Sequence, residues 1–332
     1  MAEPLVSIII TSYNREEFIE KAIQSCLSQD YPHIEIIISD NHSTDNSHAV
    51  IEKYTHDKRI KYFINDTNIG MIANYKLATR ERARGKYVTY ISSDDYLCNN
   101  KFISTAINLI NKYPDIVLVA AKNSTLFNDN NELFNDTSDH RFQQEFMYGK
   151  DVFKLFPRWL FPGWGAVLMD REKLIRTNIF ESKAQSLDHE ANLKLMLQGN
   201  LAFIKQPSYV FRKHGSNASG FMTYETQVNN LDFIENTYNY AKGLNTGIDL
   251  DAWRINVYKT YLDRNSAVLL KRKEEFDRLL VHVKNDKKIS LNLFTAPKLV
   301  INCFIYKNYT RLRFLLKHFF PKKYNSIQRI MR

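Results

Sequence analysis

Short apolar runs alternate with amphipathic segments along residues 1–121, and this alternation predicts an α/β fold. The apolar runs are continuous, as in strands that are buried on both faces of a parallel sheet. The segments between them repeat apolar residues at helical spacing, as in helices that lie against a sheet. Because parallel strands are joined by crossover helices, we expect a Rossmann-like, mainly parallel sheet flanked by helices.

The expected elements follow from these local patterns. Strands are expected over residues 5–10, 34–38, 60–64, 86–91, 116–121, 165–169 and 201–205. Helices are expected over residues 15–29, 43–54, 70–83, 101–112, 151–159 and 188–198. Residues 122–145 are rich in Asn and Asp, which predicts loops. Residues 223–284 have helical patterns, 226–242 and 252–283 above all, and predict a helical C-terminal extension.

The net charge of +10 is concentrated near the C-terminus. Residues 287–332 contain 11 Lys and Arg but no Asp or Glu, which leaves 35 basic and 36 acidic residues elsewhere. A neutral body with a basic tail argues against a general nucleic-acid-binding protein. Within the tail, apolar residues of 308–320 recur at helical spacing beside Arg and Lys, as in helices that lie on an anionic membrane surface. The alternative is that this apolar stripe packs against the body of the protein.

Two features indicate a cytoplasmic location. The chain shows neither a signal peptide nor an apolar stretch of the roughly 20 residues that a membrane span needs. Its three cysteines, Cys26, Cys98 and Cys303, are far apart and odd in number, which favours a reducing compartment over a disulfide framework.

Polar residues follow the ends of three expected strands. Thr11 and Tyr13 follow the first strand, Asp40 follows the second, and Asp94 and Asp95 follow the fourth. In an open parallel sheet these ends form the ligand-binding edge. Adjacent carboxylates repel each other unless a cation compensates them, so we expect a divalent cation, Mg²⁺ or Mn²⁺, that bridges to phosphates. The glycine-rich loops that usually cradle nucleotide phosphates are absent from the sequence.

Four ordered segments carry a family resemblance. They are Val6–Arg15, Ile38–Asn46, Asn68–Gly70 with Asn74, and Gly85–Asp95. Together they resemble the family 2 glycosyltransferases of the GT-A fold. Two later segments add to this: residues 187–195 resemble the acidic catalytic-base motif, and residues 211–219 resemble the R-x-H-x-x-S segment. The resemblance covers residues 1–222.

The resemblance implies a site for a nucleotide-sugar donor. Residues that match its donor-binding positions are Thr11, Tyr13, Asp40, Asn68, Asn74, Asp94 and Arg212. Among these, Thr11, Tyr13 and Asp40 would hold the base, and Asp40 would accept from a pyrimidine N3–H. A UDP-sugar or dTDP-sugar is therefore the favoured donor.

The resemblance also implies a metal site and a catalytic base. Asp94 would be the main metal ligand, with Asp95 and His214 as further ligands, and Asp188 would be the base. Two departures stand out: Ser92 replaces the first acid of the D-x-D motif, and Leu187 stands where an acid often precedes the base. The alternative for Asp188 is a helix cap, which is an ordinary role for an acid at a helix start.

These inferences predict three regions and one reaction. Residues 1–222 would form the catalytic domain, with a nucleotide-sugar half (1–100) and an acceptor half (101–222). Residues 223–286 would form the helical extension and 287–332 the basic tail. The expected reaction is the inverting, metal-dependent transfer of one sugar to a saccharide hydroxyl. We expect it at the cytoplasmic face of the membrane, on a lipid-linked acceptor of cell-surface polysaccharide synthesis.

Three other functions remain open at this point. A sugar nucleotidyltransferase would need a glycine-rich, basic loop after the first strand, which residues 11–15 do not provide. A nucleic-acid-binding protein would use the basic tail, although no nucleic-acid partner is expected. A sugar-binding protein without activity is suggested by Ser92 alone.

Overall fold

The computed structural model describes residues 3–127, 132–135, 143–157, 163–215, 217, 223–269, 278–279 and 281–283. Contacts within the chain divide it into two units. The first unit takes residues 1–222 and 229–250, and the second takes residues 223–228 and 251–332. Residues 229–250, expected in the helical extension, therefore belong with the expected catalytic domain.

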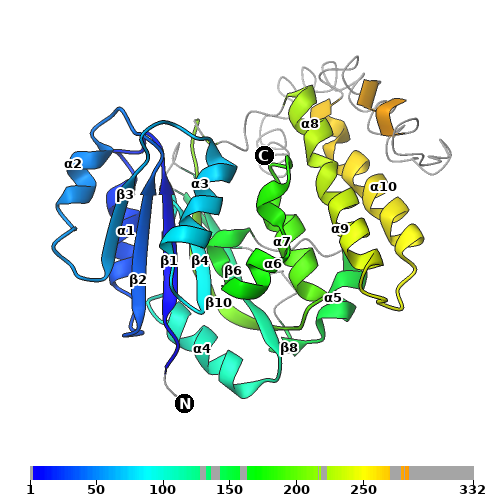
Figure 1. Cartoon of the computed structure of the whole chain (residues 1–332), viewed down its shortest axis with the longest axis horizontal. Helices are drawn as coiled ribbons and strands as arrows, with labels where there is room; N and C mark the ends of the chain where they lie inside the picture. Colours follow the sequence, from blue (N-terminus) through cyan, green and yellow to red (C-terminus); the bar gives the residue numbers. More distant parts are fainter. Residues whose placement is uncertain are drawn as a thin grey trace, which may run out of the picture. The chain divides into compact units, whose positions relative to one another are not determined.

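Four parallel strands form one side of the sheet in the first unit (Figure 1). Their order is β3 (Ile60–Ile64), β2 (Ile34–Asp40), β1 (Val6–Ser12) and β4 (Tyr87–Ser92). Ser12 is paired with Asp40, and Thr11 with Ser92, so the polar residues at the three strand ends share one edge. The predicted mainly parallel α/β sheet is confirmed.

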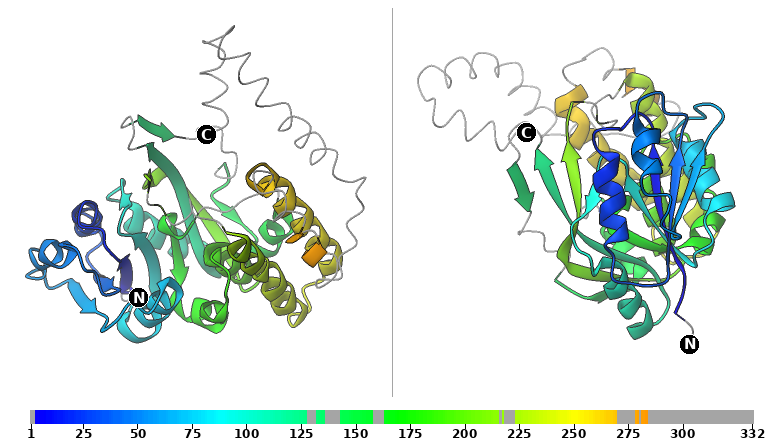
Figure 2. Two further views of the ribbon diagram at one scale, coloured as in Figure 1. Left: turned by 90° about the horizontal axis from the view of Figure 1, so that it is seen from above. Right: turned by 90° about the vertical axis from the view of Figure 1, so that its left-hand side faces the viewer.

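The sheet continues beyond β4 with mixed pairing. β9 (Val167–Asp170) runs antiparallel to both β4 and β6 (Ile116–Phe127). The long strand β10 (Asn200–Lys213) is parallel to β6, and the two lie side by side in both views of Figure 2. The short strands are β5 (Tyr96–Leu97), β7 (Glu132–Asn135) and β8 (Phe146–Met147).

The prediction of loops over residues 122–145 is wrong in part. β6 continues through residue 127, and β7 pairs with it in antiparallel fashion. Asn and Asp disfavour strands in isolation. Here β10 runs alongside as far as Lys213 and supplies backbone partners to residues 122–127, so tertiary pairing overrides the local preference.

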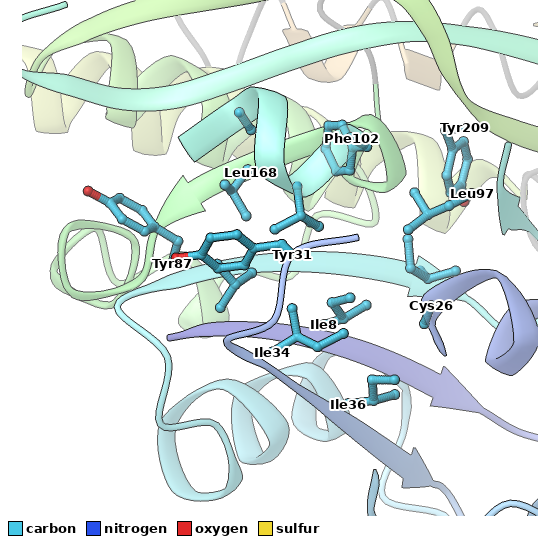
Figure 3. Packing of buried hydrophobic residues seen from close by; sticks show 14 of the residues in the cluster. Ile8, Cys26, Tyr31, Ile34, Ile36, Tyr87, Leu97, Phe102, Leu168 and Tyr209 are labelled. Atoms are coloured by element: carbon cyan, nitrogen blue, oxygen red, sulfur yellow. The ribbon is translucent and has the colours of Figure 1, made fainter. Parts of the chain in front are cut away.

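Helices pack on both faces of the sheet. α1 (Ile19–Leu27) and α4 (Phe102–Lys112) cover the face that carries Ile8 and Ile36, where Cys26 and Phe102 join the core (Figure 3). On the other face, α3 (Met71–Leu77) continues into a π-helical turn over residues 78–82. There the hydroxyls of Thr79 and Tyr90 lie 2.7 Å apart.

Of the remaining helices of the first unit, α2 (Ser47–Glu52) packs beside α1 in the nucleotide-sugar half. The others lie beyond that half in the chain and are α5 (Gly149–Leu155), α6 (Arg171–Arg176), α7 (Leu187–Met196) and α9 (Asp232–Lys242). α7 is buried over most of its length and contains an ion pair between Lys194 Nζ and Glu190 Oε1 at 2.6 Å. Asn236 of α9 also donates to Glu190, so α7 is fixed in position by polar contacts as well as apolar ones.

Helices also make up the described part of the second unit. α8 (Tyr224–Asn230) begins there, and α10 (Leu250–Leu269) follows, as the helical pattern predicted. Tyr261 donates a hydrogen bond of 2.9 Å to Gln227, which joins the two helices. None of the helices in the described ranges combines the length and the hydropathy that a membrane crossing requires. The basic tail, residues 287–332, lies outside the described residues.

Candidate active site

Two cavities open at the carboxyl edge of the parallel strands, and four residues, Met71, Tyr75, Ser92 and Asp94, line both of them. The donor cavity, of about 280 Å³, also includes Thr11, Ser12, Tyr13, Arg15, Asn41, Asn68, Asn74 and Ser93. The base cavity, of about 370 Å³, also includes Tyr90, Asp95, Asn123, Gly163, Trp164, Gly165, Gln185, Leu187, Asp188, Tyr209, Phe211 and Asn217. Asp94 therefore marks the point where the two cavities meet.

Asp40 is buried at the end of β2, with one oxygen engaged and the other unpaired. Its Oδ1 accepts from the backbone N–H of Ser43 at 2.6 Å. Its Oδ2 is buried and has no hydrogen-bond partner among the described residues. A buried acceptor without a donor is costly, so this oxygen is suited to a donor brought by a ligand. The N3–H of uracil or thymine is such a donor.

Asn74, expected to touch the donor, is engaged within the protein. Its Oδ1 accepts from Ser39 Oγ at 2.5 Å and from Asn65 Nδ2 at 3.1 Å, while its Nδ2 donates to the backbone oxygen of Ser39 at 3.0 Å. Arg82 completes this network with 2.6 Å hydrogen bonds to Ser39 Oγ and Asn65 Oδ1. In this arrangement Asn74 supports the wall of the donor cavity with its oxygen and one N–H, and the second N–H of its amide is the one group left for a ligand.

Asn68 is only partly engaged. Its Oδ1 accepts from Asn41 Nδ2 at 2.7 Å and from the backbone N–H of Gly70 at 3.0 Å. The residue is exposed and lines the donor cavity. Gly70 has a φ of +84°, a conformation that glycine adopts without strain, and this turn starts α3. Asn68 thus shapes the loop with its oxygen and lines the donor cavity.

Asp94 and His214 are brought together from positions 120 residues apart. Asp94 Oδ2 lies 3.1 Å from His214 Nε2 and 3.5 Å from Arg15 Nε. Both side chains of the Asp94–His214 pair are largely buried, at 13% and 8% exposed. The structure therefore places these two predicted metal ligands side by side at the junction of the cavities.

An aromatic ring that sequence reasoning missed supports this cluster. Phe18, just before α1, stacks on the His214 ring with centroids 4.7 Å apart. The guanidinium of Arg212 lies over the Phe18 ring, 4.9 Å from its centroid, and over the Tyr96 ring, 5.5 Å from its centroid. The helical pattern assigned Phe18 to the core, and only its place directly after the polar segment 11–15 hinted at a role in the site.

Asp95 faces away from this cluster. Its Oδ2 accepts from the Tyr209 hydroxyl at 2.5 Å, and its Oδ1 accepts from the backbone N–H of Arg212 at 2.7 Å. Burial, together with the charge of Asp94, raises the pKa of Asp95 to about 7. Both oxygens are taken by protein donors, so the metal role expected for Asp95 does not follow from this geometry. Gly165 permits the arrangement, since a Cβ there would lie 2.0 Å from the Tyr209 ring.

Asp188 lies at the start of α7 and lines the base cavity. Its Oδ1 accepts from the backbone N–H of His189 at 2.9 Å and contacts His189 Nδ1 at 3.1 Å. Burial favours the neutral acid, but the His189 ring and these hydrogen bonds outweigh it and hold the pKa of Asp188 below its ordinary value. A Cβ on Gly163 would lie 3.4 Å from Oδ2, which places that oxygen beside the Gly163–Gly165 segment.

The described residues fit a divalent cation with two protein ligands. They contain no group of three or more His, Cys, Asp and Glu side chains arranged to hold a metal ion. Asp94 and His214 offer one oxygen and one nitrogen, and a Mg²⁺-type site commonly takes its remaining ligands from substrate phosphates and water. A cation at this point would thus depend on the diphosphate of a bound donor.

This combination is an α/β domain of the GT-A class, with the Asp94–His214 pair at one end of the base cavity and the separate carboxylate of Asp188 in its lining. The family model for glycosyl transferase family 2 matches residues 7–176, just over half of the 332 residues. The chain belongs to this family, as the resemblance predicted.

Curated relatives match slightly less than a third of the chain. An uncharacterized glycosyltransferase of Haemophilus influenzae is 42% identical over 102 residues, 30% of this chain and 40% of that protein. The putative teichuronic acid biosynthesis glycosyltransferase TuaG of Bacillus subtilis is 40% identical over 94 residues, 28% of this chain and 37% of TuaG. The chain thus matches about two fifths of the length of these relatives.

A solved structure resembles the fold over a longer stretch. Staphylococcus aureus TarS 1–349 in complex with UDP-GlcNAc superimposes with a TM-score of 0.60 and 18% identity. The match covers 90% of this chain and 79% of that structure. At this identity the likeness concerns the fold, and it confirms the predicted GT-A architecture.

Proposed function

We propose that the protein transfers one sugar from a nucleotide-diphosphate sugar to a hydroxyl group of a saccharide acceptor, with inversion at the anomeric carbon. The observation that carries this proposal is the pair of cavities that meet at Asp94. The donor cavity extends from Asp94 toward Tyr13, and the base cavity extends toward Asp188. A leaving diphosphate and a base then lie on opposite sides of one sugar, as an inverting displacement requires.

Residues that line the donor cavity would hold the nucleotide together with Asp40 and Arg212, which lie outside the lining. The unpaired Oδ2 of Asp40 would accept from the N3–H of uracil or thymine, which favours UDP- and dTDP-sugars. Tyr13, whose side chain is 43% exposed, would stack on the base, and Thr11 lies beside it at the end of β1. Arg15 and Arg212 would place positive charge near the diphosphate.

Asp188 would remove the proton of the acceptor hydroxyl. As the acceptor oxygen forms its bond to the anomeric carbon, the bond from that carbon to the diphosphate breaks and the electron pair leaves with the diphosphate. The proton passes to Asp188, which is ready to accept it because its lowered pKa keeps it ionised near neutral pH. Asp94 and His214 would hold Mg²⁺ or Mn²⁺, which when bound offsets the charge that develops on the leaving diphosphate.

We further propose a lipid-linked acceptor in cell-surface polysaccharide synthesis, such as that of an O-antigen or a capsule. The names of relatives support it: besides TuaG, a Campylobacter jejuni relative named as an undecaprenol-linked glucosyltransferase is 34% identical over 117 residues. The 11 basic residues of the tail would bind the anionic inner face of the cytoplasmic membrane, where each contributes about 1 kcal/mol. The protein would then be cytoplasmic and peripherally membrane-associated.

The central experiment is a donor screen. UDP-, dTDP- and GDP-sugars are offered to the full chain, and release of the nucleoside diphosphate is measured with Mg²⁺, with Mn²⁺ and with excess chelator. We expect turnover with UDP- or dTDP-sugars that depends on the cation. Turnover that persists unchanged in chelator would rule out the metal role of Asp94 and His214, and no turnover with any donor would favour a sugar-binding protein without activity.

The membrane proposal is tested by flotation with liposomes. Full-length protein is compared with a chain that ends at Asp286, on vesicles with and without anionic lipid. We expect only the full chain to float, and only with anionic vesicles. Equal behaviour of the two chains would remove the role of the tail.

The other functions are disfavoured or separately testable. Membership of the family argues against a sugar nucleotidyltransferase. Nucleic-acid binding by the tail would appear as salt-dependent retention of the full chain on DNA that is lost with residues 287–332. We expect no such retention at physiological salt.

A further inference from the structure

Two buried polar atoms in the base cavity have no hydrogen-bond partner among the described residues. They are Nε1 of Trp164, which can only donate, and Oδ1 of Asn123, which can only accept. The same atoms are shielded from water, so the described part of the chain leaves both capacities unused. Each such group costs about 1–3 kcal/mol when it stays unsatisfied, which favours a ligand that pairs with it.

Packing against neighbouring rings holds Trp164, and pairing within the sheet holds the strand that carries Asn123. The Trp164 ring stacks on Tyr90 with centroids 4.5 Å apart and meets the edge of Tyr75 at 5.3 Å. Asn123 lies on β6, in register with Tyr209 of β10, and Tyr209 also lines the cavity. Ring packing holds the Trp164 donor in place, and strand pairing holds the backbone of Asn123. Among the described residues, neither atom has a partner.

The chemistry of the two atoms indicates what they would bind. A sugar hydroxyl accepts one hydrogen bond and donates another, which matches the indole N–H and the amide C=O of two residues that line one cavity. Aromatic side chains make up much of the remaining wall, with Tyr75, Tyr90 and Phe211 among them, and suit the apolar face of a pyranose ring. The volume of about 370 Å³ lies in the range of small-ligand sites.

The position of the cavity indicates which sugar this is. Asp94 and Asp188 both line it, and under the proposed function the transferred sugar must lie between the diphosphate and the base. We propose that Trp164 and Asn123 are specificity-determining residues that together bind one hydroxyl of the transferred sugar. This inference rests on the proposed function and extends it to the choice of donor sugar.

The test compares the affinity for UDP with that for UDP-sugars. Binding of UDP, UDP-glucose, UDP-galactose and UDP-GlcNAc is measured by calorimetry on the wild-type chain and on Trp164→Phe and Asn123→Ala. Trp164→Phe retains an aromatic ring against Tyr90 but removes the N–H. We expect UDP affinity to be unchanged and the gain from the preferred sugar to fall about tenfold, the usual worth of one such hydrogen-bond pair in a buried site.

A deoxy donor makes the comparison decisive. The analogue of the preferred UDP-sugar that lacks the bound hydroxyl should lose about tenfold in affinity on wild type and nothing further on either variant. Thr89→Val is the matched control, because Thr89 Oγ1 is also buried without a partner but does not line the cavity. It should leave every affinity unchanged, and thermal unfolding of each variant identifies any that fails to fold.

The outcomes separate the two levels of the proposal. Equal sugar gains in wild type and variants, or equal losses for UDP and UDP-sugars, would overturn the role of Trp164 and Asn123 while the proposed function stands. A change confined to the acceptor dependence of turnover would also overturn it, by assigning the pair to the acceptor. Failure of every nucleotide sugar to bind the wild-type chain would overturn the proposed function itself.

Discussion

The donor cavity and the base cavity use their polar side chains differently. Around the donor cavity, the amides of Asn65 and Asn74 bond to each other and to Ser39, which stiffens the wall. In the base cavity, Trp164 and Asn123 keep polar atoms unpaired. The comparison teaches that a polar residue within a motif marks the neighbourhood of a site, whereas its hydrogen-bond partners decide between supporting the site and touching the ligand.

The largest expected effect is that of Asp188→Asn on turnover. The amide cannot accept the acceptor proton, so turnover should fall by roughly 10²-fold or more, while donor affinity stays within a few-fold of wild type. The lowered pKa predicts that, in the wild type, ionisation of Asp188 limits activity only below its ordinary value of 3.8. Steady-state rates and calorimetry on the same preparations measure both quantities. Unchanged turnover would leave Asp188 as a helix-terminal residue only.

Asn74→Ala should act on stability. The change removes the partner of Ser39 Oγ and of Asn65 Nδ2 in a buried network, and each unsatisfied group costs about 1–3 kcal/mol. We therefore expect the free energy of unfolding in urea to fall by an amount in that range, with UDP affinity nearly unchanged in the folded fraction. A stable variant that no longer binds UDP would instead show that Asn74 contacts the ligand.

Asp40→Asn should act on base recognition. Oδ1 is held by the Ser43 N–H, so the amide nitrogen of the variant would occupy the place of Oδ2 and oppose the N3–H of uracil or thymine. We expect UDP and dTDP affinities to fall about tenfold, with ADP, which lacks that N–H, affected less. Calorimetry with the three nucleotides measures the difference, and equal losses would show that Asp40 acts through the loop structure alone.

The sheet and the strand-end residues were predictable from sequence because their signals are local. The continuous apolar runs define β1 to β4, and parallel pairing then brings Thr11, Asp40 and Asp94 to one edge whatever the details of packing. The strand over residues 122–127 was not predicted, since Asn123 and the Asn- and Asp-rich sequence after residue 127 favour loops, and it is paired because β10 lies alongside. Phe18 and Asn123 were missed as site residues for a similar reason: their roles depend on which neighbours tertiary packing supplies or withholds.

Asn68→Ala gives the smallest effect and the sharpest contrast with Asn74. Asn68 is exposed, and its oxygen bonds only to Asn41 and the Gly70 backbone in a surface loop, so its loss should lower the free energy of unfolding by at most about 0.5 kcal/mol. Asn68 lines the donor cavity, where one exposed hydrogen bond from its amide nitrogen to a ligand would contribute about 1 kcal/mol or less. UDP affinity should therefore fall a few-fold in Asn68→Ala, against almost no change in Asn74→Ala. If the two variants lose stability and affinity in the same proportion, the distinction between a wall residue and a ligand contact fails for this cavity.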